Sequence, residues 1–191
     1  RQMCIRDRFL SKPKVEAEIA LTVYKVSGET NTDDFSPAKE AWSRPDIPLH
    51  AQAFLKWSEN ISDPLEKLTE LKTDGSKLAF VGDVVGTGSS RKSAVNSMLW
   101  HMGDEIPFVP GKKTGGFCFG NKIAPIFYNT LQDSGAFPIE LDVDALEHGL
   151  KIILKPYDGQ ILDATSKEII TKFDLKSEVI FDEVRAGGRI N

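Results

Sequence analysis

The pattern of apolar and polar positions is clearest between residues 77 and 102. β-Branched, aromatic and aliphatic residues form a run that predicts a buried strand, at Leu78, Phe80, Val81, Val84 and Val85. Gly86, Thr87 and Gly88 follow and predict a tight turn, because glycine tolerates backbone conformations that other residues avoid. Beyond the turn, apolar residues recur on one face of a helix, at Ala94, Val95, Met98, Leu99 and Met102. The stretch therefore predicts a strand, a glycine turn and a helix in direct succession.

The chain before this stretch predicts one strand, one loop and two short helices. Alternation and β-branching predict a strand at residues 21–26. The polar, turn-forming residues 27–38 predict a long ordered loop and not a strand. Amphipathic helices that start with proline are expected at residues 48–57 and 64–71. His50 is a lone histidine on the first of these helices, and its expected role is structural.

The second half of the chain is dominated by short alternating runs. Residues 110–120 are glycine-rich and predict a surface hairpin or lid, and Cys118 is expected to be a small buried residue. A helix is predicted at residues 123–131, despite a proline within it. Strands are predicted at 137–141, 151–155, 160–163 and 168–174. Early helices followed by late strands indicate an α/β domain of the layered β/β/α type.

Length and composition limit the class of protein. A chain of 191 residues with 40% hydrophobic residues can bury one substantial core. Neither an apolar run long enough to span a bilayer nor a signal peptide is recognisable, so a soluble, cytoplasmic protein is expected. The two cysteines, Cys4 and Cys118, are too few for an iron–sulfur cluster and far apart in the sequence.

The N-terminal residues do not share the pattern of the rest. Residues 1–8 have no periodicity that continues into the chain, and we interpret them as a translated sequencing or adaptor artefact. Residues 9–20 are expected to be a linker or the tail of a preceding domain, and 21–191 a single domain of a longer chain. Without the first eight residues, 21 basic and 27 acidic residues remain and the net charge falls from −4 to −6. Such an acidic domain is a poor general binder of nucleic acids.

The candidate chemistry lies where the glycine turn meets the helix. Ser89, Ser90 and Arg91 stand at the helix start, where backbone N–H groups and the helix dipole favour an anion. Two hydroxyls and a guanidinium there suit a carboxylate or a phosphate better than a metal ion. The pattern is equally compatible with plain helix caps and a solvated arginine. A dinucleotide-binding fingerprint is excluded because Arg91 stands at its third glycine, and a P-loop because its Gly-Lys-Ser/Thr is absent.

The same residues resemble a known family. Residues 85–93, Val-Gly-Thr-Gly-Ser-Ser-Arg-Lys-Ser, resemble the Gly-x-Gly-Ser-Ser-Arg loop in the mobile swivel domain of the aconitase superfamily. Residues 28–37 resemble the Thr-Asp-x-x-Ser segment of the same superfamily. Residues 41–50 and 182–190 are similar to segments of the bacterial type-B aconitases in particular. Asp34, where other aconitases have histidine, and Lys92, where they have an acid, also resemble type B.

The resemblance implies a fold and a reaction. It implies the swivelling β/β/α layered domain of an aconitate hydratase, which interconverts citrate and isocitrate through cis-aconitate. Type-B members are also expected to act on 2-methylisocitrate. The roles implied by motif position are a proton-abstracting base for Ser89, carboxylate binding for Ser90, Arg91 and Arg44, and orientation of the arginine and serine of the main loop for Asp33. The loop glycines, Gly86 and Gly88, are expected to let the backbone approach the substrate closely.

The resemblance also implies a cofactor and partners. Aconitases carry a [4Fe–4S] cluster, and this sequence lacks the thiolates to hold one. The cluster is therefore expected in other domains of the same parent chain, and no metal site is expected in this chain. The isolated chain is expected to be inactive on its tricarboxylate substrate.

Two other functions remain open. One is the small subunit of a two-chain hydro-lyase such as 3-isopropylmalate dehydratase, which uses a related swivel domain. The other is a non-catalytic module, since the apo forms of some aconitases bind messenger RNA. The net negative charge, and the lack of a basic face with interspersed aromatic residues in the sequence pattern, argue against RNA binding by this chain alone.

Overall fold

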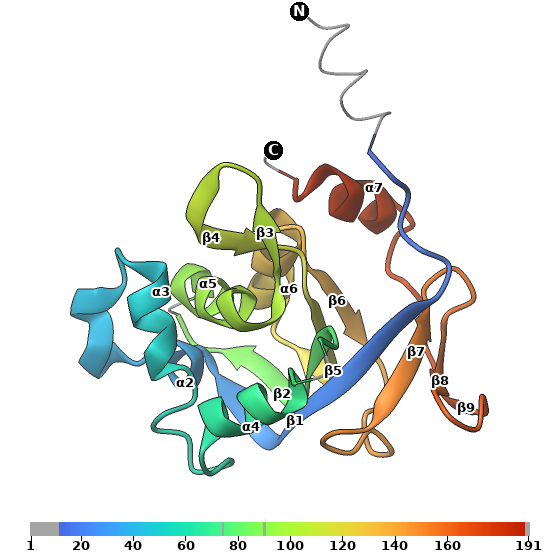
Figure 1. Ribbon diagram of the computed structural model, residues 1–191, viewed down its shortest axis with the longest axis horizontal. Coiled ribbons are helices and arrows are strands. Elements are labelled where there is room, and N and C mark those ends of the chain that lie inside the picture. Colours follow the sequence, from blue (N-terminus) through green and yellow to red (C-terminus); the bar gives the residue numbers. More distant parts are fainter. Residues whose placement is uncertain (1–11, 74, 90, 190–191) are drawn as a thin grey trace, which may run out of the picture.

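The computed structural model describes residues 12–73, 75–89 and 91–189, and its centre is a seven-stranded mixed sheet (Figure 1). The strand order is β6-β5-β2-β1-β7-β8-β9. The first four strands in this order are parallel: β6 (Phe137–Glu140), β5 (Phe117–Ile123), β2 (Leu78–Thr87) and β1 (Ile19–Asn31). The remaining three continue the sheet in antiparallel fashion: β7 (Lys151–Lys155), β8 (Gln160–Asp163) and β9 (Ile169–Lys172).

Short helices and one hairpin surround the sheet. The helices are α2 (Thr32–Phe35), α3 (Ile47–His50), α4 (Pro64–Leu71), α5 (Arg91–Met102), α6 (Pro125–Asp133) and α7 (Val179–Ala186). Two 3-10 segments, η1 (Ala38–Ser43) and η2 (Ala51–Ala53), flank α3. The hairpin pairs β3 (Asp104–Ile106) with β4 (Val109–Thr114) directly after α5.

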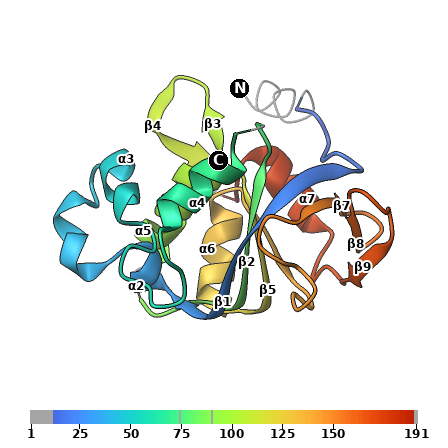
Figure 2. The same cartoon turned by 60° about the horizontal axis from the view of Figure 1, so that its bottom comes forward.

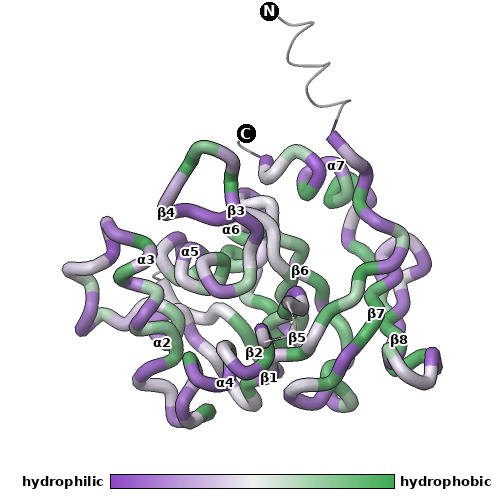
Figure 3. The backbone as a smooth tube through the Cα atoms, viewed as in Figure 1, coloured by the Kyte–Doolittle hydropathy of each residue, from purple (hydrophilic) through white to green (hydrophobic). Residues whose placement is uncertain are grey.

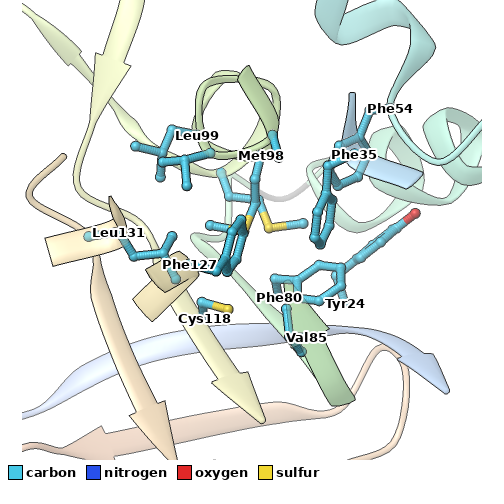
Figure 4. Packing of buried hydrophobic residues seen from close by; sticks show 14 of the residues in the cluster. Tyr24, Phe35, Phe54, Phe80, Val85, Met98, Leu99, Cys118, Phe127 and Leu131 are labelled. Atoms are coloured by element: carbon cyan, nitrogen blue, oxygen red, sulfur yellow. The ribbon is translucent and has the colours of Figure 1, made fainter. Parts of the chain in front are cut away.

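Each face of the parallel half of the sheet carries its own core. Tyr24 and Phe80 point to the side of α4, α5 and α6, where a cluster of aromatic residues, methionines and leucines fills the space (Figure 4). On the other face, Val23 and Val81 join a second cluster with Ile152 of β7 and with residues of β8 and α7. The antiparallel half and α7 therefore cover the face that the other helices leave open, as Figure 2 shows. The predicted β/β/α layering is the observed arrangement.

Several elements lie where the sequence predicted them. The strand, glycine turn and helix predicted between residues 77 and 102 are β2, a bend and α5, although β2 runs on through Gly86 to Thr87 and the bend starts only at Gly88. The predicted helix at 64–71 is α4 with the same ends, and the four late strands are β6 to β9 within two residues. The helix predicted at 123–131 begins at Pro125, where the missing N–H costs no helical hydrogen bond, and runs on to Asp133.

The predicted loop at 27–38 is wrong for its first residues. Strand β1 continues to Asn31 through a bulge after Val26, where Gly28 has φ +80°. Past the bulge, Glu29 and Thr30 pair with Val84 and Val85 of β2. The polar composition concealed the strand, because its end is stabilised by backbone pairing and not by buried apolar side chains.

The predicted helix at 48–57 is also wrong in extent. Helical structure begins at Ile47 and ends at Ala53, because Phe54 is extended and Leu55 has a left-handed φ of +56°. Leu55 donates its N–H to the Asp34 carbonyl and is fully buried. Trp57, the last residue of the predicted helix, lies outside the helical structure and is 52% exposed.

The glycine-rich segment 110–120 divides into two elements. Its first part is the β4 strand of the surface hairpin, as predicted, and its lysines make this strand hydrophilic (Figure 3). Its second part belongs to β5, a buried central strand, after Gly115 and Gly116 with positive φ. Cys118 lies on β5 and is fully buried, as predicted.

The segment before β1 is anchored to the C-terminal helix. Lys12 donates to the Ala186 carbonyl and its own carbonyl accepts from Arg185. β1 begins at Ile19, two residues earlier than the predicted start of the domain. Within the described part of the chain, no helix combines the length and apolarity needed to cross a membrane.

Candidate functional site

Two glycines shape the end of β2 and the loop that follows it. Gly86, near the end of the strand, and Gly88, in the loop, have φ of +81° and +102°, which side-chain-bearing residues rarely adopt. A β-carbon on Gly86 would lie 2.2 Å from the ring of Phe127. Phe127 stacks in turn on Phe35 of α2, with ring centroids 5.7 Å apart. The closest neighbours at Gly86 therefore belong to the core, so core packing requires this glycine whatever the approach of a substrate.

The second glycine contacts the segment that resembles Thr-Asp-x-x-Ser. A β-carbon on Gly88 would lie 2.6 Å from Thr32 Oγ1, and Thr32 is fully buried. This contact places the loop against the first residue of α2. Asp33 is the next residue on α2 and is exposed, so it stands at the surface beside the loop.

Helix α2 is fixed by its own cap. Asn31 Oδ1 accepts from the backbone N–H groups of Asp33 and Asp34, and the Asp34 carboxylate accepts from the Asn31 N–H at 2.7 Å. This is a reciprocal capping box. Partial burial raises the pKa of the Asp34 carboxyl above its usual value, while the Asn31 hydrogen bond opposes that shift. Asp34 is thus a structural acid, and Asp33 is the one left at the surface.

Ser36 brings Arg44 next to helix α5. Arg44 donates from Nε to Ser36 Oγ at 3.2 Å and from Nη2 to the Ser36 carbonyl at 3.1 Å. The Ser36 hydroxyl also lies 2.8 Å from the hydroxyl of Ser93, in the first turn of α5. Ser36 itself is fully buried. One buried serine therefore connects the arginine segment to the helix that follows the glycine loop.

His50 completes this buried polar group. Its Nε2 lies 2.7 Å from Ser36 Oγ and its Nδ1 2.8 Å from Ser43 Oγ. Burial, reinforced by the Arg44 charge, holds the pKa of His50 below its ordinary value, so the imidazole is neutral near pH 7. The prediction that His50 has a structural role agrees with these contacts.

The structure brings most of the predicted site segments together. The loop contacts α2, which carries Asp33, and Ser36 connects Arg44 to the first turn of α5. Ser89 is exposed between Gly88 and α5, and Arg91 is the first residue of that helix. Ser90 lies outside the described residues.

The described residues do not fit a metal or an iron–sulfur cluster. No group of three or more histidine, cysteine, aspartate or glutamate side chains within them is arranged to hold a metal ion. Cys118 is the described cysteine, and complete burial raises the pKa of its thiol, which disfavours a metal-binding thiolate.

Comparison with known proteins places the chain in a family. The family model described as "Aconitate hydratase 2 N-terminus" matches residues 21–191. The chain belongs to this family. The resemblance to the bacterial type-B aconitases, inferred above from four sequence motifs, is thereby confirmed.

The relatives of this aconitate hydratase 2 N-terminal chain are much longer proteins. Aconitate hydratase B of Pseudomonas aeruginosa is 57% identical over 190 residues, which cover 95% of this chain and 22% of that protein. The protein of the same name from Escherichia coli is 54% identical over 190 residues, with 95% and 22% coverage. That of Synechocystis sp. is 58% identical over 182 residues, with 95% and 21% coverage. The chain spans about a fifth of the length of these relatives.

A solved structure shares the fold at low sequence identity. The crystal structure of 3-isopropylmalate dehydratase (leuD) from Methanocaldococcus jannaschii matches with a TM-score of 0.66 at 18% identity. The match covers 91% of both chains. It confirms the predicted α/β fold class.

Sequence reasoning missed the residues that connect the site segments. Ser36 lies within the Thr-Asp-x-x-Ser resemblance but received no role, and Ser93 was included only as the last residue of the loop motif. The available signals were Ser36, which ends the Thr-Asp-x-x-Ser segment, and Ser93, which follows the Gly-x-Gly-Ser-Ser-Arg loop within one helical turn. Their pairing depends on tertiary packing, which one sequence does not display.

Proposed function

We propose that this chain is the swivel domain of an aconitate hydratase, the enzyme that interconverts citrate and isocitrate through cis-aconitate. The observation that supports this most is the match of residues 21–191 to the aconitate hydratase 2 N-terminal family. Because the chain is about a fifth of the length of its relatives, it contributes part of a site whose remainder lies in the same parent chain. Residues 21–191 form the domain. The tricarboxylate 2-methylisocitrate is a second substrate of the same enzyme.

Ser89 is the proposed base. It is exposed and follows Gly88, two residues before Arg91, where α5 begins. Its oxygen takes the carbon-bound proton of the substrate, and a serine oxygen can act so only when its negative charge is stabilised. The N-terminal end of α5, with its N–H groups, and the Arg91 guanidinium supply that stabilisation.

The arginines bind the carboxylates. A tricarboxylate needs several fork-shaped donors to fix its orientation, and a guanidinium binds a carboxylate through two parallel hydrogen bonds. Arg91 and Ser90 at the start of α5 hold one carboxylate, and Arg44, fixed by Ser36, holds another. Asp33 orients the loop from α2.

The [4Fe–4S] cluster belongs to other domains of the parent chain. Nothing among the described residues suits it, so no step that involves the cluster is assigned to this chain. The domains that carry the cluster are the partners of this one, in a cytoplasmic enzyme.

A second candidate is the small subunit of a two-chain hydro-lyase. The fold likeness to 3-isopropylmalate dehydratase favours it, with a TM-score of 0.66. The first candidate is preferred because identity to the three aconitate hydratases named above is 54–58%, against 18% for the dehydratase.

The full-length parent enzyme provides the test. Ser89→Ala is expected to lower kcat for citrate by at least about a hundredfold, because a catalytic base contributes about that much or more. Ser62→Ala, an exposed serine before α4, is the matched control and should leave kcat unchanged. The isolated 191-residue chain should show no turnover. Activity of the isolated chain, or an unchanged kcat in Ser89→Ala, would refute the assignment.

A further inference from the structure

A buried chain of hydrogen bonds links His50 to Arg44 through the Ser36 hydroxyl. His50 is 2% exposed, and Ser36 and Ser43 are 0% and 4% exposed. The imidazole lies between the two serines, at 2.7 Å from Ser36 Oγ and 2.8 Å from Ser43 Oγ. Arg44 reaches the same Ser36 oxygen from its Nε at 3.2 Å. The four side chains thus form one polar group within the fold.

The direction of each hydrogen bond in this group follows from Ser43, which stands at the opposite end of the group from Arg44. Ser43 donates its single hydroxyl proton to the Glu40 carbonyl at 2.7 Å. Its oxygen must therefore accept from His50, which places the imidazole proton on Nδ1. Nε2 of the neutral ring is then an acceptor. Two neighbours of Ser36 Oγ can accept its one proton, Nε2 at 2.7 Å and Ser93 Oγ at 2.8 Å. A neutral ring with its proton on Nδ1 has nothing to donate from Nε2, so the Ser36 proton goes to Nε2 and Ser93 is the donor between the two hydroxyls. The lone pairs of Ser36 Oγ are left to face Arg44, whose Nε–H is a donor.

We propose that His50 is a positioning residue that holds Arg44 in its carboxylate-binding place through Ser36. A serine hydroxyl rotates freely unless an acceptor fixes its proton, and a proton turned toward Arg44 would face another donor. By taking that proton, His50 keeps Ser36 Oγ an acceptor for the guanidinium. The inference rests on the proposed function only in that Arg44 is taken to bind a substrate carboxylate.

The same hydroxyl extends the effect to the glycine loop. Ser36 Oγ lies 2.8 Å from Ser93 Oγ in the first turn of α5, two residues after Arg91. The second bond of Arg44, from Nη2 to the Ser36 carbonyl, does not involve the hydroxyl. Loss of His50 should therefore loosen Arg44 without detaching it, and the effect should be on substrate binding more than on the chemical step.

Two amide substitutions separate this role from simple packing. The amide of glutamine reaches about as far as Nε2 of histidine, whereas that of asparagine reaches about as far as Nδ1. In the full-length parent enzyme, His50→Asn should raise KM for citrate about tenfold with kcat changed less than threefold, and His50→Gln should restore most of the affinity. His101→Gln is the matched control: it alters a second, partly buried histidine, which bonds to the Ala51 carbonyl, and should leave KM unchanged. Equal KM values for His50→Asn, His50→Gln and the unaltered enzyme would overturn the proposal.

A spectroscopic measurement on the unaltered 191-residue chain does not depend on activity or on the folding of a variant. Nitrogen-15 NMR at pH 7 should show His50 protonated at Nδ1 and unprotonated at Nε2, and the Arg44 Nε–H should exchange slowly with solvent. An Nε2–H tautomer or a charged ring would overturn the proposal directly. Lack of aconitase activity in the parent enzyme would refute the proposed function instead and leave this measurement to decide the role of His50.

Discussion

Gly88 lies so close to Thr32 that a β-carbon on the glycine would fall 2.6 Å from the threonine hydroxyl oxygen. The two residues belong to the two motifs that most resemble the aconitases, and 56 positions separate them in the sequence. Such an approach leaves no room for a side chain at residue 88. The loop before α5 and helix α2 are therefore packed against each other at this point.

The packing at Gly86 gives a test of the loop that does not require enzyme activity. Gly86→Ala places a β-carbon 2.2 Å from the Phe127 ring at a residue with φ +81°. We expect a loss of about 3 kcal/mol in the free energy of unfolding, of which about 1 kcal/mol is backbone strain and the rest overlap. Urea denaturation of the chain, followed by circular dichroism, measures this difference.

Gly75→Ala is the matched control for this substitution. Gly75 has a similar φ of +75°, but a β-carbon there would meet nothing within 4 Å. It should therefore cost only the backbone strain of about 1 kcal/mol. Equal losses for the two variants would show that the contact between Gly86 and Phe127 does not constrain the loop.

The sequence predicted the elements with a clear apolar pattern. β2 is an almost continuous buried run, α5 buries apolar residues at helical spacing, and proline marked the first turns of α4 and α6. The candidate site followed from the glycine turn and the motif resemblance, which together located Ser89, Arg91, Arg44 and Asp33.

The rest of the structure depends on contacts that periodicity does not encode. The end of β1 is polar and exists because Glu29 and Thr30 pair with β2. The first predicted helix ends early because Leu55 is buried in a left-handed conformation. The connection between Ser36 and Ser93 unites residues 57 positions apart. Each of these depends on which residues become neighbours only after folding.

The partly buried imidazole of His101 predicts a loss of stability in mild acid. Burial is the main cause that lowers its pKa to about 4, from 6.5 in the unfolded chain, and Lys72 and Lys113 act in the same direction. Below pH 6.5 the unfolded chain binds a proton at this residue and the folded chain does not. The stability that comes from the neutral imidazole is therefore complete above pH 6.5 and is lost as pH falls toward 4. The total from this residue is up to about 3 kcal/mol.

Thermal unfolding of the chain between pH 4 and 7 measures this effect. Tm should fall with decreasing pH, and His50, whose pKa is also lowered, adds to the decline. His101→Gln keeps a donor for the Ala51 carbonyl but cannot be protonated, so its Tm should depend less on pH. A pH dependence identical to that of the unaltered chain would assign the acid sensitivity to other groups.

Arg91 and Lys92 offer a matched pair at the start of α5. Arg91→Lys in the parent enzyme should raise KM for citrate about tenfold, because an ammonium group cannot replace two parallel hydrogen bonds to a carboxylate. Lys92→Arg alters the exposed neighbour on the same turn and should leave KM unchanged. Steady-state kinetics at constant ionic strength separates the two. A similar rise in KM for both variants would indicate general charge attraction in place of specific carboxylate binding.

Cys118 tests whether this chain takes any part in holding the cluster. Its side chain is fully buried on β5 between two phenylalanines, and burial raises the pKa of the thiol. In a chain with Cys4→Ser, the remaining thiol should not react with a disulfide reagent while the protein is folded, and one equivalent should react in denaturant. The rate of reaction in the folded state should then follow the opening of the sheet, since the reagent reaches the sulfur only when β5 separates from β2 and β6. Fast reaction in the folded chain, or protection of the thiol by added iron and sulfide, would mean that Cys118 is accessible as a ligand, and the placement of the cluster entirely in other domains would have to be abandoned.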